Sequence, residues 1–261
     1  MDLGLKNKTA LVLGAGGGLG RAVALSLARE GAHVAVANRS ADRLEKTYEL
    51  LSAQGARCIA LQWDLGDLSL IDRNIAEIEK QLGPVEVLIN NTGGPPPTAA
   101  AGANLAVWEE NFRTMVLSVL AISDRVLPGM RERKWGRILT LTSSGVVAPI
   151  PNLAISNALR LSLVGWSKTL AREVAGDGVT ANVVAPGRIA TDRISFLDQK
   201  RAEREGRDVS EVQRESTSAI PAGRYGDPEE FADVVTFLAS ERASYVTGSI
   251  IRVDGGLVAG I

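Results

Sequence analysis

The chain has 261 residues, 45% of them hydrophobic and 23% charged, with a formal net charge of −1. These proportions are typical of a globular protein. The chain has no basic excess that would indicate a nucleic-acid partner and no acidic tail that would indicate a disordered interaction segment. Because no apolar run is long enough to span a membrane, no signal peptide is evident and Cys58 is the only cysteine, we expect a cytoplasmic protein without a membrane partner or a metal site.

Short apolar runs alternate along the chain with longer amphipathic stretches. The runs predict seven strands, at residues 9–14, 33–38, 57–63, 85–90, 137–143, 179–185 and 249–255. The amphipathic stretches predict helices at 18–30, 41–54, 67–82, 104–132, 152–175 and 227–240. Most of the strands are apolar at nearly every position, which suits a parallel sheet buried on both faces. We therefore expect a single α/β domain over residues 1–261, a Rossmann-like doubly wound sheet in three layers.

Two segments fall outside this alternation. Residues 92–103 include three consecutive prolines, which cannot lie inside a strand or helix, so they predict a loop. Residues 192–220 form a long insert rich in both acidic and basic side chains. Its charges suit a solvated helix face, and its position before the last helix and strand also makes it a candidate substrate lid.

A glycine-rich turn lies between the first strand and the first helix. Gly14, Gly18 and Gly20 have the spacing G-x-x-x-G-x-G, and Gly16, Gly17 and Leu19 complete the turn. Glycine lets the backbone turn tightly and approach a pyrophosphate, and the helix that follows offers free N–H groups and the positive end of its dipole. No G-K-[ST] ending is present, so the turn predicts a dinucleotide site and not a nucleoside-triphosphate loop.

These features occur together with several others, in order along the chain. They are Asp64 after the third strand, the run Asn90-Asn91-Thr92-Gly93 after the fourth, Ser143 at the end of the fifth, the segment Pro186-Gly187-Arg188-Ile189-Ala190-Thr191, and a C-terminal region from Pro221 to Gly256. In all of them the chain resembles the short-chain dehydrogenase/reductase family, and 3-oxoacyl-carrier-protein-reductase-like members in particular. The resemblance covers essentially the whole chain.

The resemblance implies a cofactor site and an assembly. Asp64 and Leu65 would flank the adenine, Asn90 would lie along the ribose, and Ile189 and Thr191 would hold the nicotinamide carboxamide and the neighbouring phosphate. Thr92, Gly93, Pro186 and Gly187 would complete that site. The substrate would be a small molecule, and the chain would form a homotetramer or homodimer.

The end of the second strand bears on the choice between NAD and NADP. An acid there would bind the adenosine ribose and repel a 2′-phosphate, whereas this strand ends in Asn38-Arg39. A guanidinium suits a phosphate, so we expect NADP(H) to be favoured over NAD(H). Gly17 stands where many NADP-using relatives carry a basic residue, and Arg39 could also be an ordinary solvated arginine.

The catalytic positions depart from the family. Aligning residues 165–175 with the family's usual helix places Ser143 on its serine, Ser156 on its tyrosine, Arg160 on its lysine and Met115 on its asparagine. Arg160 keeps a positive charge that could hold the ribose, but a guanidinium is a poor acid or base. A serine hydroxyl is shorter and far less acidic than a phenol with a pKa of ~10.

Three interpretations remain open. The protein could be an oxidoreductase with an atypical site of Ser143, Ser156 and Arg160, because hydride transfer depends first on orientation. It could bind a dinucleotide without turnover, as a sensor or a partner subunit. Arg160 could instead bind the carboxylate of a different substrate. The single histidine, His33, reads as the first residue of a strand, and Tyr225 is a weak candidate to replace the missing tyrosine.

Overall fold

The computed structural model describes residues 1–260 and contains one sheet of seven parallel strands. The spatial order is β3-β2-β1-β4-β5-β6-β7, so the chain reverses direction across the sheet between β1 and β4. The strands are β1 (Thr9–Val12), β2 (His33–Asn38), β3 (Cys58–Gln62), β4 (Val85–Asn90), β5 (Gly136–Leu141), β6 (Val179–Pro186) and β7 (Ile250–Val253). The predicted Rossmann-like fold and its seven strands are confirmed.

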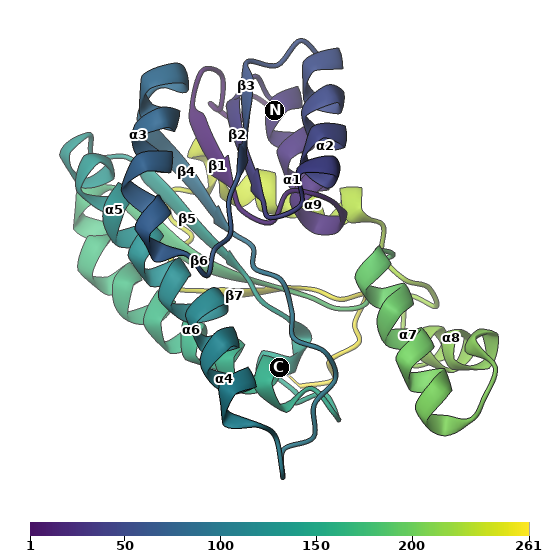
Figure 1. Cartoon of the computed structure of the whole chain (residues 1–261). Coiled ribbons are helices and arrows are strands. Elements are labelled where there is room, and N and C mark those ends of the chain that lie inside the picture. The colour runs from purple at the N-terminus through teal and green to yellow at the C-terminus, as the bar shows by residue number, and fades with distance from the viewer. Residues whose placement is uncertain (261) are drawn as a thin grey trace.

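Helices cover both faces of the sheet (Figure 1). One layer holds α1 (Gly18–Arg29), α2 (Ala41–Ala53) and α9 (Pro228–Leu238). The other holds α3 (Ile71–Leu82), α5 (Ser118–Glu132) and α6 (Ala154–Val174). No helix among residues 1–260 is both long and apolar enough to cross a membrane.

The continuous apolar strands are explained by this three-layer arrangement. Successive strand residues point to opposite faces, so both faces of a central strand need apolar side chains. In β1, Ala10 and Val12 pack in the cluster under α1 and α9, whereas Leu11 and the following Leu13 pack in the cluster under α3 and α6. All four side chains are fully buried.

The helix predicted over 104–132 is interrupted. It consists of α4 (Leu105–Phe112), a π-helical turn over Arg113–Leu117, and α5. A π turn adds one residue to a helical turn and so displaces the buried face beyond it. Here it places Met115 and Val116 in a small core cluster with α6, while α4 has no buried residue.

The fifth strand is shorter than predicted and ends before Ser143. Its last residue is Leu141, and the Thr142 N–H still donates to the Val184 carbonyl at 2.9 Å. Ser143 then caps a short 3₁₀ turn, since its Oγ accepts from the Gly145 N–H at 3.1 Å. The Ser143 side chain thus offers the local backbone a hydrogen-bond partner other than the neighbouring strand, and the ladder of the sheet ends here.

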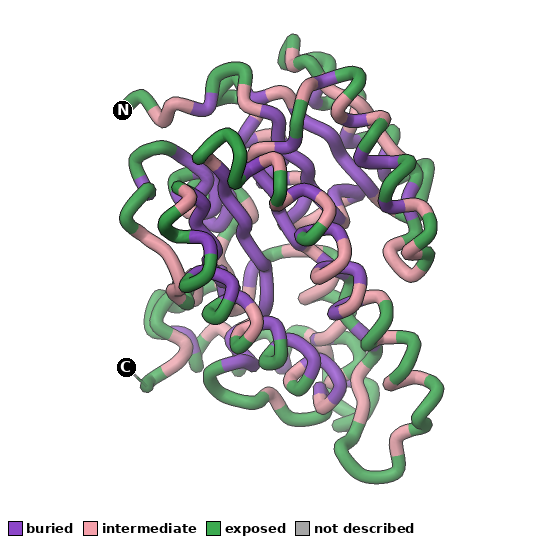
Figure 2. Tube along the Cα trace, turned by 90° about the vertical axis from the view of Figure 1, so that its left-hand side faces the viewer, coloured by how far each residue is buried: buried purple, intermediate pink, exposed green. Residues whose placement is uncertain are grey.

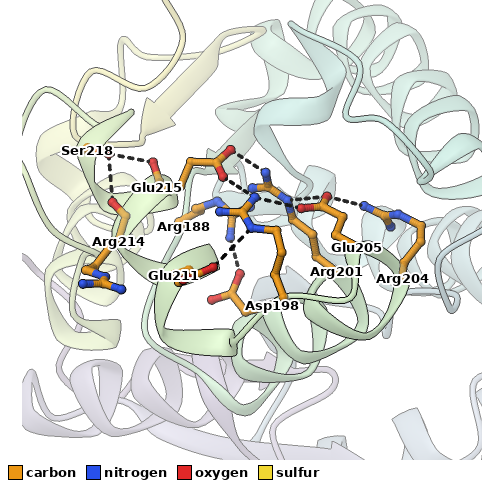
Figure 3. Close-up of polar contacts among 10 residues, drawn as sticks. Arg188, Asp198, Arg201, Arg204, Glu205, Glu211, Arg214, Glu215 and Ser218 are labelled. Atoms are coloured by element: carbon orange, nitrogen blue, oxygen red, sulfur yellow. Dashed lines mark hydrogen bonds and ion pairs between the residues drawn. The ribbon is translucent and has the colours of Figure 1, made fainter.

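The predicted insert forms two helices, α7 (Asp192–Glu205) and α8 (Val209–Ser218), which project from the sheet (Figure 1). Most residues of α7 and α8 are exposed, whereas the chain through the centre of the molecule is buried (Figure 2). Arg201 of α7 pairs with Glu215 of α8 (Figure 3). Arg207, in the turn between the two helices, also pairs with Glu215. The prediction of a solvated, charged helix face is confirmed, and the lid function stays a prediction.

One charged group of the insert is buried. Asp198 of α7 is 1% exposed and accepts from Arg188 Nη1 at 2.7 Å and from the Tyr225 hydroxyl at 2.7 Å. Arg188 follows β6, and Tyr225 precedes α9. The carboxylate therefore ties α7 to two segments of the main domain.

Candidate functional site

A cavity of about 810 Å³ lies along the carboxyl ends of the central strands. It extends from the glycine turn after β1, past the segments that follow β4 and β5, to the start of α7. In a doubly wound sheet, ligands bind in this crevice, where the strand order reverses. Its volume is within the usual range for pockets that bind small molecules and cofactors.

The glycine turn leaves room for a ligand at the start of α1. Gly14 and Gly18 have left-handed backbones, with φ of 61° and 50°. A Cβ on Gly20 would collide with the Gly14 carbonyl, whereas a Cβ on Gly17 would meet nothing nearer than Arg21 at 4.0 Å. Gly17 caps α1 without a side chain, so N–H groups of the first turn stay free for an anion. This cradle fits the pyrophosphate of a dinucleotide.

Two arginines line the cavity near the end of β2, and the residue that ends this strand is not an acid. The Asn38 side chain packs against Gly16, and its Oδ1 accepts from the Ser40 N–H at 2.8 Å. Arg39 and Arg43 both line the cavity. Arg43 forms only a solvent-exposed pair with Asp192, 3.7 Å away.

Arg160 is buried at the inner wall and bonds to backbone. Its Nη1 donates to the Leu141 carbonyl at 3.0 Å, and its Nη2 lies 3.3 Å from the Gly93 carbonyl and 3.5 Å from that of Thr92. Its Nε donates to Ser156 Oγ at 3.3 Å. The guanidinium thus joins the ends of β4 and β5 to α6.

No carboxylate balances this charge within residues 1–260. Burial, together with the positive charge of Arg193, lowers the pKa of Arg160 to about 10. At neutral pH the group remains almost entirely protonated, so it is a fixed cation and not a general base. A buried cation whose only partners are uncharged oxygens is costly, and an anion or a set of hydroxyls in the cavity would compensate its charge.

Two hydroxyls face the same space. Ser143 and Ser156 both line the cavity, and Ser156 is 7% exposed. Each oxygen accepts a bond from the protein, Ser143 from Gly145 and Ser156 from Arg160. Each hydroxyl proton can therefore be donated to a substrate oxygen.

Most of the predicted cofactor residues line this cavity, and four do not. Those that do are Gly14, Gly16, Gly17, Gly18, Leu19, Asn38, Arg39, Thr92, Gly93, Arg160, Pro186, Gly187, Ile189 and Thr191. Gly20, Asp64, Leu65 and Asn90 do not line it. Asn90 is 1% exposed, and its Nδ2 donates to Ser123 of α5 at 3.2 Å. Their contact with a cofactor stays a prediction.

Tyr225 does not replace the missing phenol. Its hydroxyl donates to Asp198, and it does not line the cavity. Burial and the Asp198 bond raise the pKa of Tyr225, which makes it a weaker proton donor. His33 is also remote, because it is the first residue of β2 and so lies at the amino ends of the strands, whereas the cavity lies at their carboxyl ends. Its Nδ1 is 3.3 Å from the Leu82 carbonyl.

Several lining residues were missed from the sequence. Asn91 lines the cavity and donates to the Gly14 carbonyl at 3.2 Å, which the alternation of side chains after β4 could have indicated. Arg193 lines it from the first turn of α7, two residues after Thr191. The C-terminal residues 257–259 also line it, and no sequence signal marks them.

Comparisons with known proteins agree with this geometry. A family model described as enoyl-(acyl carrier protein) reductase matches residues 14–258. The 3-oxoacyl-[acyl-carrier-protein] reductase FabG of Escherichia coli (strain K12) is 36% identical, over 98% of this chain and 99% of the relative. Nodulation protein G of Azospirillum brasilense is 35% identical, over 97% and 99%. The chain belongs to the short-chain dehydrogenase/reductase family.

Solved structures of other short-chain dehydrogenase/reductases superpose closely on this one. The L-sorbose reductase of Gluconobacter frateurii, in complex with NADPH and L-sorbose, has a TM-score of 0.93 and 30% identity, with 100% of both chains covered. YwfH, an NADPH-dependent reductase involved in bacilysin biosynthesis, has a TM-score of 0.92 and 30% identity, with 97% of this chain and 99% of the other covered.

In the alignment that the resemblance implies, Ser156, Arg160 and Met115 stand at the family's tyrosine, lysine and asparagine. Ser156 and Arg160 line the cavity, and Met115 does not. Met115 is 2% exposed and packs in the cluster with α6. Its thioether cannot relay a proton, so any proton path must run through the cavity itself.

Proposed function

We propose that the protein is an NADP(H)-dependent oxidoreductase that interconverts a carbonyl and an alcohol on a small or acyl-type substrate. One observation carries the proposal: a single cavity joins the glycine turn and Arg39 to Ser143, Ser156 and Arg160. A cofactor bound along it would reach the hydroxyls with its reactive end. Relatives named for NADPH-dependent reduction support the same reaction class.

The preference for NADP(H) rests on charge at the end of β2. Arg39 and Arg43 are exposed and line the cavity. Among residues 1–260, Arg39 has no ion pair, and Arg43 has only the exposed pair with Asp192 at 3.7 Å. Either guanidinium can donate hydrogen bonds to a 2′-phosphate, and Asn38 has no carboxylate that would repel it. Glycine at position 17 leaves the phosphate cradle open.

When bound, the nicotinamide would supply or accept hydride. Ser143 and Ser156 would hold the substrate oxygen with their hydroxyl protons, and the proton for the alcohol would come from water or from the substrate. The fixed charge of Arg160 would stabilise negative charge that develops on that oxygen. This site catalyses by orientation and electrostatics, without the acidic phenol of its relatives.

A second function is a dinucleotide-binding protein without turnover, acting as a sensor or partner subunit. Met115 and Ser156 favour it, because neither offers the proton path or the acidity of the residues they replace. The two functions differ in one result: whether bound NADPH transfers hydride to any carbonyl substrate.

The first test is calorimetric titration with NADPH and, separately, NADH. We expect tight NADPH binding and weak NADH binding. Arg39→Asp should weaken NADPH binding by roughly 10- to 100-fold, the range for losing hydrogen bonds to a charged group. Arg73→Asp is the charge-matched control, since Arg73 is an exposed residue of α3 outside the cavity. Binding of neither nucleotide would remove both proposed functions.

We also propose that the protein is cytoplasmic and assembles as a homotetramer or homodimer. Among residues 1–260 the outer edge of β7 has no neighbouring strand, and Ile250 of β7 and Tyr245 shortly before it are 43% and 101% exposed. An exposed edge strand flanked by apolar side chains is suited to pairing with another copy. Light scattering on the purified protein measures the assembly, and a monomer at working concentration would contradict it.

A further inference from the structure

The arginines of the cavity differ in how their charges are balanced. Arg39 and Arg43 lie at the end expected to hold the adenosine, and Arg188 is paired with the buried Asp198. The other two arginines that line the cavity are Arg160, at the inner wall, and Arg193, at the start of α7. Neither forms an ion pair with any residue from 1 to 260.

Arg193 reaches from α7 to the loop that follows β4. Its Nη2 donates to the Pro95 carbonyl at 2.7 Å, and its guanidinium lies 5.6 Å from the centre of the Phe196 ring. A Cβ on Gly94 would come within 2.9 Å of the same Nη2, so the glycine makes room for the guanidinium. The Pro95 bond is its only hydrogen bond to a described residue, which leaves most of its N–H groups free.

The two guanidiniums therefore hold neighbouring residues of one loop. Arg160 lies against the Gly93 carbonyl from α6, and Arg193 binds the Pro95 carbonyl from α7. Their charges repel, as the effect of Arg193 on the pKa of Arg160 shows, and burial lowers the pKa of Arg193 as well. Glycines and prolines supply no side chain that could neutralise them. Two partly desolvated like charges beside one cavity favour an anionic ligand.

We propose that the substrate carries a carboxylate that binds Arg193, with Arg160 as a second positive charge behind it, so that the protein acts on oxo acids or hydroxy acids. This inference rests on the proposed oxidoreductase function. A carboxylate matches the planar fork of a guanidinium and can form two parallel hydrogen bonds with it. The carbonyl of the same molecule would meet the hydroxyls of Ser143 and Ser156.

Because Arg193 belongs to α7, the carboxylate would also link the substrate to the projecting helices. Binding would add a contact between α7 and the main domain beyond the Pro95 bond and the Asp198 pair. The insert would then distinguish substrates by charge as well as by shape.

The test uses oxo acids of increasing length together with their uncharged methyl esters: pyruvate, acetoacetate, 4-oxopentanoate and 5-oxohexanoate. NADPH oxidation is followed at 340 nm, and binding of each compound to the complex with NADP⁺ is measured by calorimetry. The variants are Arg193→Gln and, as a control on the same helix, Arg204→Gln. Arg204 pairs with Glu205 and does not line the cavity.

We expect at least one acid to be preferred over its ester, and Arg193→Gln to lower kcat/KM or affinity for that acid by roughly 10- to 100-fold. The kcat/KM for the ester should be the same in both variants as in the unmodified protein. Arg204→Gln should behave as the unmodified protein with the acid as well. NADPH affinity should stay within about twofold in both variants.

Three results would overturn the inference. They are equal use of acids and esters, no response to any acid while NADPH still binds, or an equal loss of NADPH affinity in Arg193→Gln, which would assign the guanidinium to a cofactor phosphate. Failure of NADPH to bind the unmodified protein would instead remove the proposed function itself, so the two failures are distinct.

Discussion

Replacing Arg160 separates a structural role from a ligand-binding role. Arg160→Met keeps much of the side-chain length and removes the charge and all the hydrogen bonds. The loss orphans the Leu141 carbonyl, whose bond to Nη1 is the shortest of the set at 3.0 Å. An unsatisfied buried acceptor costs about 1–3 kcal/mol.

The opposing effect is relief of a buried charge. Burial is the main cause that lowers the pKa of Arg160 from its ordinary value to about 10. At 1.36 kcal/mol for each pKa unit, this difference corresponds to about 3 kcal/mol of strain on the charged form. The two effects are opposite in sign and of comparable size, so the free energy of unfolding of Arg160→Met should change by no more than about 2 kcal/mol.

The affinity for NADPH, unlike the stability, should change clearly in Arg160→Met. If the charge holds the ribose, removing it should weaken NADPH binding by about 1–3 kcal/mol, or roughly 5- to 150-fold. Urea unfolding gives the stability and calorimetry gives the affinity. Arg160→Lys, which keeps a charge at this position, should retain most of the affinity. A large loss of stability with unchanged NADPH affinity would refute this reasoning and leave Arg160 as a structural clamp.

Three other predictions concern the hydroxyls, the insert and the last helix. Ser143→Ala should abolish turnover while Ser156→Ala lowers it only mildly, as steady-state rates with the best substrate would show, and a fully active Ser143→Ala would contradict the proposed site. Asp198→Ala should destabilise the protein by about 1–3 kcal/mol and expose α7 to limited proteolysis, because it leaves Arg188 without its buried partner; unchanged cleavage of α7 would argue against that anchor. The pKa of Glu230 is lowered to about 2, chiefly by its bond to Arg224, so its contribution to stability is present above its unfolded pKa of ~4.3 and is lost as the pH falls towards 2. Glu230→Gln should flatten the dependence of stability on pH within that window, and an unchanged acid-unfolding profile would contradict the assignment.

The fold was predictable from sequence because its causes are local and repetitive. Apolar runs such as that of β6, buried at every position, predict a central parallel strand. The start of α9 follows from Asp227 and Pro228, and the structure has a capping box there with proline in the first turn. The glycine turn was equally readable, because Gly14 and Gly18 are needed for their backbone conformation.

The break in the helix over 104–132 was less accessible. Nothing in the local pattern distinguishes a π turn at Arg113–Leu117 from a regular helix, because the extra residue is stabilised by packing of Met115 and Val116 with α6. The early end of β5 at Leu141 depended likewise on one side-chain bond, that of Ser143 to Gly145.

The sequence by itself determined the order of strands and helices, the phosphate cradle, and the absence of a phenol and an amine at positions 156 and 160. These depend on residue type and on spacing within short segments, where backbone geometry leaves few alternatives. Only the tertiary structure decided that Arg160 donates hydrogen bonds to carbonyls at the ends of β4 and β5. It also decided that Arg193 binds the Pro95 carbonyl in the same loop after β4. Both arrangements join residues far apart in the chain, and whether a charge finds an acid partner depends on which distant groups the fold brings beside it.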